Sequence, residues 1–196
     1  MEAHEFNLEP GSLLPRDCGY VLLSALSKQH PFLHGRADIQ IAPVRGTRLY
    51  DNHAMMRTDS KSILHIRGLT EEDARKLERT WCRVGTSLVA LGEMRTRTLT
   101  PSSYLSARSV VFANKLSPME VLTEVARRIA SPNIRVTVGR SQGLQMHGRH
   151  FTGFQIGLSD LDEATSLRVQ AEEVGRFTSM GCGVFYPGTR ESLRAA

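Results

Sequence analysis

The sequence is short of cysteine. Only Cys18, Cys82 and Cys182 occur among 196 residues, and none of them has a second cysteine or a histidine at the spacing of zinc ligands. An odd number of widely separated cysteines excludes a disulfide framework and is typical of a reduced compartment. We therefore expect each cysteine to be a small buried side chain, and the protein to be cytoplasmic.

Long apolar runs are missing as well. The longest, residues 21–26, is interrupted by Ser24, whereas a membrane-spanning helix needs about 20 apolar residues. Residues 1–7 are acidic and polar and lack the basic and apolar regions of a secretion signal. The sequence therefore predicts no membrane partner.

The common catalytic motifs are absent. The chain has no phosphate-binding GxxxxGK[ST] loop, no HExxH helix and no GxSxG elbow, and its acidic residues lie mostly on predicted helix surfaces. We therefore expect no metal site and no cofactor, and any catalysis to be acid–base chemistry by side chains.

Lysine and aromatic residues are scarce, while arginine is abundant. Only four of the 25 basic residues are lysines, the formal net charge is +5, and aromatics make up 6% of the chain. Arginine forks suit phosphates and base edges, so the charge favours a nucleic-acid partner. The few aromatics argue against base stacking on a sheet as the main binding mode.

Four stretches carry helix signals, at about residues 17–29, 70–81, 117–129 and 161–175. Thr70 is expected to cap the second, with Trp81 on its inner face, and Ser117 to open the third as a capping box with Glu120. The expected inner faces of the last two helices are Met119, Leu122, Val125, Ala126 and Ile129, and Ala164, Leu167, Ala171 and Val174.

Alternating apolar residues predict strands between these helices, with His4 exposed at the start of the first strand and His65 on an outer sheet face. The order of elements is β-α-β-β-α-β, twice over. This order predicts an α+β fold of two tandem ferredoxin-like βαββαβ units, as domains 1–100 and 101–196 joined by the polar connector 100–103.

Two histidines follow the first predicted helix. His30 and His34 flank the run Pro31-Phe32-Leu33, and histidine is the usual proton shuttle near neutral pH. A loop at this place can present an imidazole to a cleft. The simpler interpretation is that either ring interacts with the carbonyl end of the helix.

A basic hairpin is expected in the second half. Its strands and turn carry Arg135, Arg140, His147, Arg149 and His150. Such a hairpin can follow phosphates or enter an RNA groove, and the alternative is a solvated turn.

Residues 175–187 form a glycine-rich stretch between the last helix and the last strand. Arg176, Gly181 and Gly183 are its candidate ligand-binding residues, because backbone amides without side chains can approach a phosphate closely. The alternative is a tight helix-to-strand turn.

Several runs along most of the chain are shared with one family. They are Gly19-Tyr20, residues 31–34 (Pro-Phe-Leu-His), 43–46 (Pro-Val-Arg-Gly), 166–170 (Ser-Leu-Arg-Val-Gln) and 179–187 (Ser-Met-Gly-Cys-Gly-Val-Phe-Tyr-Pro). With the tandem fold they make the chain resemble the CRISPR repeat-cleaving endoribonucleases, the Cas-six family of the RAMP superfamily, and within it the small branch first named from myxobacteria.

The resemblance implies a metal-independent nuclease that cuts precursor CRISPR RNA within each repeat. A 2′-hydroxyl would attack the adjacent phosphate, leaving a 2′,3′-cyclic phosphate and a 5′-hydroxyl. The family's histidine after the first helix matches His34, with His30 as the second choice. The implied partners are the repeat RNA, as a stem-loop, the mature guide RNA and other CRISPR effector subunits. The alternative is an RNA-binding subunit of such a complex that does not cut.

Overall fold

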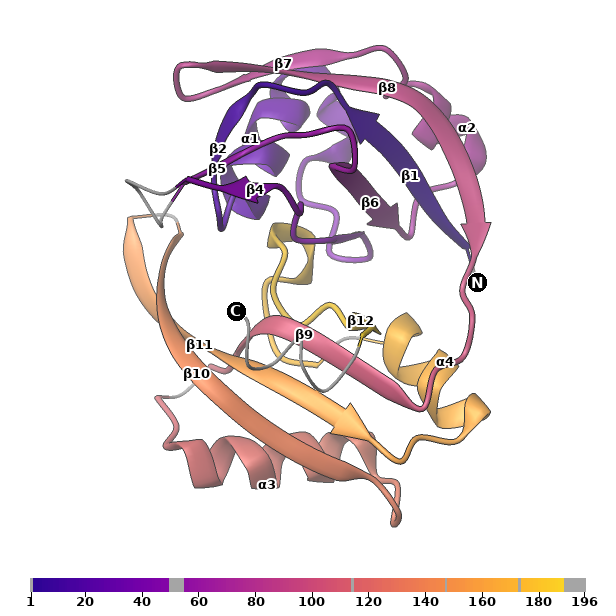
Figure 1. The fold of residues 1–196 in the computed structure, drawn as a ribbon, viewed down its shortest axis with the longest axis vertical. Coiled ribbons are helices and arrows are strands. Elements are labelled where there is room, and N and C mark those ends of the chain that lie inside the picture. Colours follow the sequence, from indigo (N-terminus) through magenta and orange to yellow (C-terminus); the bar gives the residue numbers. More distant parts are fainter. Residues whose placement is uncertain (1, 50–54, 114, 147, 173, 189–196) are drawn as a thin grey trace. The chain divides into compact units, whose positions relative to one another are not determined.

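The computed structural model describes residues 2–49, 55–113, 115–146, 148–172 and 174–188. They form two compact units. Unit 1 comprises Met1–Thr98 and Ser179–Gly181, and unit 2 comprises Leu99–Thr178 and Cys182–Ala196. Each unit has its own hydrophobic core and antiparallel strands (Figure 1). The α+β fold class is therefore confirmed.

Unit 1 contains a five-stranded sheet in the order β3-β6-β1-β8-β7. Its strands are β1 (Glu2–Leu8), β3 (Gln40–Ile41), β6 (Ile63–Arg67), β7 (Trp81–Val84) and β8 (Ser87–Thr98). A second sheet joins β2 (Leu13–Pro15), β5 (Met55–Arg57) and β4 (Thr47–Arg48). With the β7–β8 hairpin in the place of the last strand, the five-stranded sheet and two helices form a βαββαβ unit.

The first helix of unit 1, α1 (Gly19–Gln29), buries Leu22 and Leu26 in the core of the unit. These residues are one turn apart and therefore lie on the same face. Pro31 opens a short 3₁₀ helix, η1 (Pro31–Leu33), directly after α1. A proline fits the first position of a helix and cannot continue the previous one, so the chain turns at His30.

The second helix is shorter than the sequence predicts. α2 spans Glu71–Arg75, and the Thr70 side chain caps it by accepting the Asp73 amide. Arg79 has a φ of 55°, which an α-helix cannot contain. Trp81 opens β7 instead of ending a helix, and it is 58% exposed. The prediction that Trp81 lies on a helical inner face is wrong.

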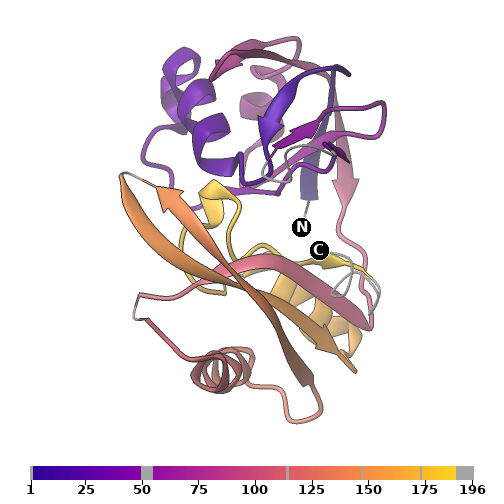
Figure 2. The same ribbon diagram turned by 60° about the vertical axis from the view of Figure 1, so that its left-hand side comes forward.

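Unit 2 repeats the same topology, with the sheet order β10-β11-β9-β12. Its elements are β9 (Tyr104–Val111), α3 (Pro118–Ile129), β10 (Arg135–Met146), β11 (Arg149–Ser159), α4 (Glu163–Ala171) and β12 (Tyr186–Pro187). Figure 2 shows α3 end on, beside the long β10–β11 hairpin.

The capping box of α3 is present as predicted. Ser117 Oγ accepts the Glu120 amide, and the Glu120 carboxylate accepts the Ser117 amide at 2.7 Å. The buried face consists of Val121, Val125 and Ile129, whereas Met119, expected inside, is 71% exposed. The buried residues of α3 lie at i, i+4 and i+8, so its apolar face is narrower than the face predicted from the sequence.

The predicted inner face of α4 is wrong. Leu167 is exposed, and the helix buries the polar side chains of Ser166 and Gln170. Ser166 Oγ accepts the Ser102 amide at 2.8 Å, and Gln170 Nε2 donates to the Thr100 carbonyl at 2.9 Å. The helix packs against the backbone of the connector, whose polar groups need hydrogen-bond partners when buried.

His4 also differs from the prediction. It is 2% exposed, its Nε2 donates to the Leu69 carbonyl at 3.0 Å, and its Nδ1 lies 3.2 Å from Thr96 Oγ1. The reason is that β1 lies between β6 and β8 in the middle of the sheet. The three cysteines are buried, as expected. Within the described part of the chain, no helix is long and apolar enough to cross a membrane.

Replacing Gln170 by leucine should destabilise the protein although the change is apolar. It leaves the Thr100 carbonyl without its side-chain donor, at a cost of about 1–3 kcal/mol. The matched control, Leu167→Gln, removes an exposed apolar side chain and should change the free energy of unfolding by less than about 0.5 kcal/mol. Urea unfolding followed by circular dichroism measures both, and a larger loss for Leu167→Gln would contradict the role of Gln170.

Candidate functional site

The segment after α1 presents two imidazoles four residues apart. The His30 amide donates to the Leu26 carbonyl at 2.8 Å and so ends α1, while the His34 amide donates to the Pro31 carbonyl at 2.9 Å and ends η1. The 3₁₀ turn between them fixes the backbone at both histidines.

The His30 side chain is held within unit 1. Its Nε2 lies 3.1 Å from Thr80 Oγ1, and its ring meets the Phe32 ring edge to face at 5.9 Å. Partial burial lowers the pKa of His30 below its usual value, which favours the neutral imidazole. Thr80, and not a helix carbonyl, is the polar partner of this ring.

The His34 side chain is exposed. No hydrogen bond or ion pair joins its imidazole to another residue in the described ranges. Nearby Arg36 is anchored, since its Nε donates to Asp38 Oδ1 at 2.6 Å and its Nη2 to the Gly68 carbonyl at 2.9 Å. Of the two candidate histidines, His34 is the one whose ring is available to a substrate.

His65 has a structural partner. Its Nδ1 lies 3.3 Å from Glu5 Oε1, across the β1–β6 pair. Burial lowers the pKa of His65, and the Glu5 carboxylate opposes that shift.

The basic residues of the hairpin in unit 2 lie far apart along its strands. Arg149 and His150 begin β11 at the turn, whereas Arg135 pairs with Ser159 at the opposite end, and its Nε lies 3.7 Å from Asp160 Oδ2. At about 3.3 Å per residue, some ten residues of strand put Arg135 about 33 Å from Arg149. Arg140 is exposed beside the irregular pairing between Val138 and Ser141. His147 lies outside the described residues.

The glycine-rich stretch is built by close backbone contacts. Gly183 has a φ of 68°, its amide donates to the Ser109 carbonyl at 2.6 Å, and a Cβ there would collide with the Val174 carbonyl. The Arg176 amide donates to the Val111 carbonyl at 2.8 Å, and its guanidinium lies 5.1 Å from the centre of the Phe177 ring. The backbone of Gly183 is therefore already used inside unit 2.

Gly181 differs from Gly183. It belongs to unit 1, has a φ of 90°, and a Cβ there would meet nothing closer than 3.7 Å. Nearby, a Cβ at Gly19 would collide with the Met180 carbonyl, so α1 starts on a glycine where the loop backbone touches it.

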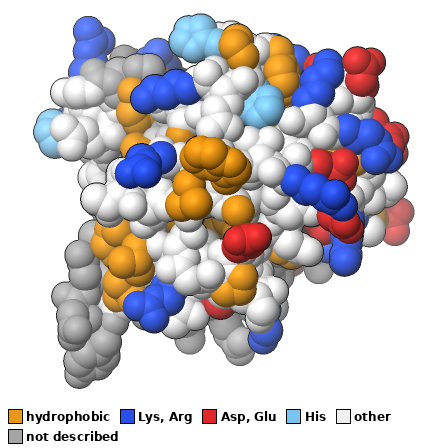
Figure 3. Space-filling model, turned by 90° about the horizontal axis from the view of Figure 1, so that it is seen from above, with side chains coloured by type: hydrophobic (Ala, Val, Ile, Leu, Met, Phe, Trp, Pro, Cys, Tyr) orange, Lys and Arg blue, Asp and Glu red, His pale blue; other side chains and the backbone are white. Residues whose placement is uncertain are grey.

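An apolar patch on the β7–β8 hairpin was missed by the sequence analysis. Trp81 and Leu88 are 58% and 54% exposed. Figure 3, which views the molecule from the β7–β8 side of Figure 1, shows apolar side chains in the middle of a face that also carries basic and histidine side chains. In the structure, exposed Trp81 and Arg83 alternate with buried Cys82 and Val84, as is typical of a strand.

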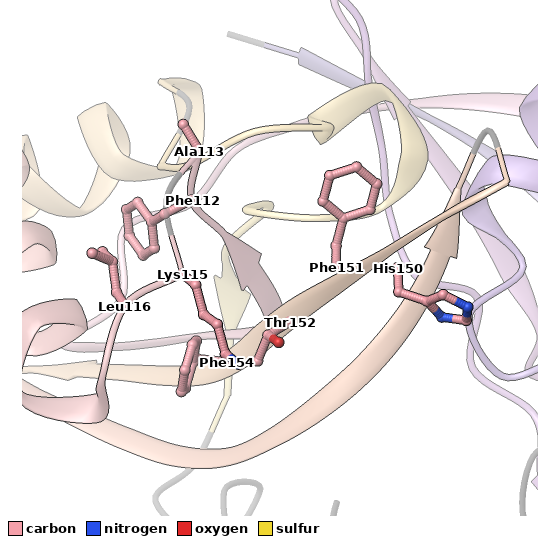
Figure 4. Close-up of a pocket in the computed structure, with 8 residues that line it drawn as sticks. All are labelled: Phe112, Ala113, Lys115, Leu116, His150, Phe151, Thr152 and Phe154. Carbon is pink, nitrogen blue, oxygen red and sulfur yellow. The ribbon is translucent and has the colours of Figure 1, made fainter.

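A pocket in unit 2 was missed too. It has a volume of about 240 Å³ and lies between the start of β11 and the chain that leaves β9 (Figure 4). Its lining residues are Phe112, Ala113, Lys115, Leu116, His150, Phe151, Thr152 and Phe154. They come from two segments about 40 residues apart, and no sequence motif marks them.

The described residues offer no ready metal site. Among them, no three His, Cys, Asp or Glu side chains come together in a way that would hold an ion.

These two units define the class of the protein, a tandem ferredoxin-like α+β protein. Solved structures share this fold over nearly the whole chain. One titled "CRISPR associated protein Cas6" has a TM-score of 0.63 at 13% identity and covers 96% of this chain and 99% of that one. One titled "An RAMP protein binding different RNA substrates" has a TM-score of 0.65 at 11% identity and covers 94% and 98%. These likenesses confirm the predicted fold.

Sequence comparison gives the family. The family model described as Cas6 Crispr matches residues 4–190. The CRISPR-associated endonuclease Cas6 of Myxococcus xanthus (strain DK1622) is 29% identical over 184 residues, which cover 92% of this chain and 79% of that protein. The chain belongs to the Cas6 family, as the resemblance predicted.

The two loop glycines should respond differently to alanine. Left-handed backbone costs an alanine about 1–2 kcal/mol, and this is the loss expected for Gly181→Ala. Gly183→Ala should cost more, because its Cβ also meets the Val174 carbonyl. Urea unfolding compares the two variants, and equal losses would show that the contact with Val174 relaxes freely.

Proposed function

We propose that the chain is a metal-independent endoribonuclease that cleaves precursor CRISPR RNA within its repeats. Family membership supports an RNA-processing nuclease, since the Myxococcus relative is named a CRISPR-associated endonuclease. A solved structure of the same fold, with a TM-score of 0.53, is titled Thermus thermophilus Cse3 bound to an RNA representing a pre-cleavage complex. The exposed, uncommitted imidazole of His34 is the observation on which the cleavage mechanism rests.

In the proposed reaction, a ribose 2′-oxygen attacks the adjacent phosphorus while its proton passes to a general base. The new O2′–P bond forms as the P–O5′ bond breaks, and the 5′-oxygen takes up a proton. The products are a 2′,3′-cyclic phosphate and a 5′-hydroxyl. Neither metal nor cofactor enters this chemistry, and histidine suits both proton transfers near neutral pH.

His34 is assigned to proton transfer before His30 for a geometric reason. The His30 ring is engaged by Thr80 and Phe32, and turning it toward a substrate would break both contacts. The His34 ring has no hydrogen bond or ion pair with a described side chain that a substrate would have to replace. His30 is the alternative, and its lowered pKa keeps it in the basic form at neutral pH.

Binding of the repeat RNA, as a stem-loop, is assigned to the cations of unit 2 and to the glycine-rich stretch. The proposed residues are Arg135, Arg140, His147, Arg149, His150, Arg176, Gly181 and Gly183. The part proposed for Gly183 is to shape the loop, because its amide already donates to the Ser109 carbonyl. Arg149 and His150 are exposed together at the hairpin turn, which suits contact with a phosphate backbone. Mature guide RNA and other effector subunits are the further partners proposed.

His34→Ala should slow cleavage of the host's repeat RNA by about 10²–10⁴-fold, the usual contribution of a general acid or base. The affinity for the repeat should stay close to that of the wild type, because the proposed RNA-binding residues are unchanged. Single-turnover cleavage and filter binding measure the two quantities. His30→Gln is the matched variant, and a cleavage loss there with normal cutting by His34→Ala would move the role to His30.

Cleavage should survive EDTA and should vanish when one ribose of the repeat lacks its 2′-hydroxyl. A series of repeat RNAs, each with a single 2′-deoxy position, would locate the attacking group. The upstream product should carry a cyclic phosphate, detectable by mass spectrometry. Tight binding without any cut would favour the non-cleaving RNA-binding subunit, and loss of the cut in EDTA would exclude a metal-independent reaction.

A further inference from the structure

We propose that the pocket between Phe112 and His150 in unit 2 binds one unstacked base of the repeat RNA. This inference rests on the proposed function and adds to it a specific recognition site. All of the residues that line the pocket belong to unit 2, and none of them is His30 or His34.

The size and lining of the pocket suit a single planar ring system. Sites for drug-sized ligands have volumes of about 300–1,000 Å³, and this pocket, at about 240 Å³, is smaller. Figure 4 shows Phe112, Leu116 and Phe154 grouped at one end. Phe112 and Phe154 are almost fully buried in the core of unit 2, and Phe151 is the partly exposed aromatic side chain of the lining. Aromatic side chains are the usual partners of bases that are splayed out of single-stranded RNA.

The charges around the pocket favour an anionic ligand. Its lining contains Lys115 and His150 and no Asp or Glu. The nearest acids along α3 are already engaged, Glu120 by Ser117 and Glu124 by Arg127 and Arg128. An apolar peptide side chain would gain nothing from this cationic rim, whereas a nucleotide places its base inside and its phosphate beside the rim.

The position of the pocket relates it to the RNA-binding hairpin. His150 lines the pocket and follows Arg149 at the start of β11. A strand of RNA whose phosphates lie along Arg149 and His150 therefore has a base within reach of the pocket. In Figure 4, His150 lies at the far end from Phe112, with Thr152 between them along β11.

The proposal is tested with a substitution that fills the pocket and leaves Arg149 and His150, the proposed phosphate contacts, unchanged. Thr152 is exposed, lines the pocket and pairs with Gly143, so Thr152→Trp places a ring into the base site. The matched control is Thr137→Trp. Thr137 is also exposed and also faces a glycine, Gly157, on the same hairpin, but it does not line the pocket.

Affinities are measured for the intact repeat RNA and for a series in which each nucleotide in turn is abasic. With the wild type, one abasic position should weaken binding by about 5- to 150-fold, which corresponds to the stacking of one base. Thr152→Trp should weaken binding of the intact repeat by a similar factor, and the abasic change should then cause no further loss. Thr137→Trp should behave as the wild type does.

Unchanged affinity for the repeat in a folded Thr152→Trp variant would overturn the base site. The base site would also be overturned if the abasic position weakened binding to Thr152→Trp by the same factor as binding to the wild type. If the wild type itself neither binds nor cuts the repeat, the proposed function fails, and the base site fails with it. Normal binding and cutting by both variants would overturn only the base site.

Discussion

The backbone at the end of β9 anchors the part of the glycine-rich stretch that belongs to unit 2, and it leads directly into the pocket. The carbonyls of Ser109 and Val111 accept the amides of Gly183 and Arg176, and the next residue, Phe112, lines the pocket. A Cβ at Gly175 would lie 2.6 Å from the Val111 carbonyl. Glycine is required here because two backbones meet with no room for a side chain. The position of the glycine-rich stretch thus depends on β9, as does that of the pocket.

Backbone hydrogen bonding also explains why the start of α3 was predicted correctly from the sequence and the buried face of α4 was not. The capping box of α3 was predictable because Ser117 and Glu120 are neighbours in sequence and satisfy each other's backbone groups. The face of α4 was not, because Ser166 and Gln170 satisfy the backbone of residues 100–102, about 65 residues away. Hydrophobic periodicity identifies only a face that meets apolar neighbours. α4 buries Val169 in the core of unit 2, but its buried Ser166 and Gln170 meet the backbone of the connector.

The same distinction applies to the candidate site. The segment carrying His30 and His34 was predictable, because Pro31 marks the end of α1 within a few residues of both rings. The pocket was not, because Phe112 and Phe154 are brought together only by the pairing of β9 with β11. The prediction that Trp81 belongs to a helix failed for a local reason. The helical region ends before Arg79, whose backbone is left-handed, and arginine is not a residue type that signals a turn.

The net charge of +5 says little about where RNA would bind, because many arginines have carboxylate partners. Arg75 is bonded to Glu71, Arg79 to Glu93, and Arg127 and Arg128 share Glu124. By contrast, Lys115 and Arg149 have no ion pair with any residue that the structure describes. Such cations can exchange counterions for phosphates, each with a slope of roughly −0.7 in log affinity against log salt for single-stranded RNA. Under the proposed binding mode, the salt dependence of repeat binding reports the cations that contact phosphates, and not the total number of basic residues.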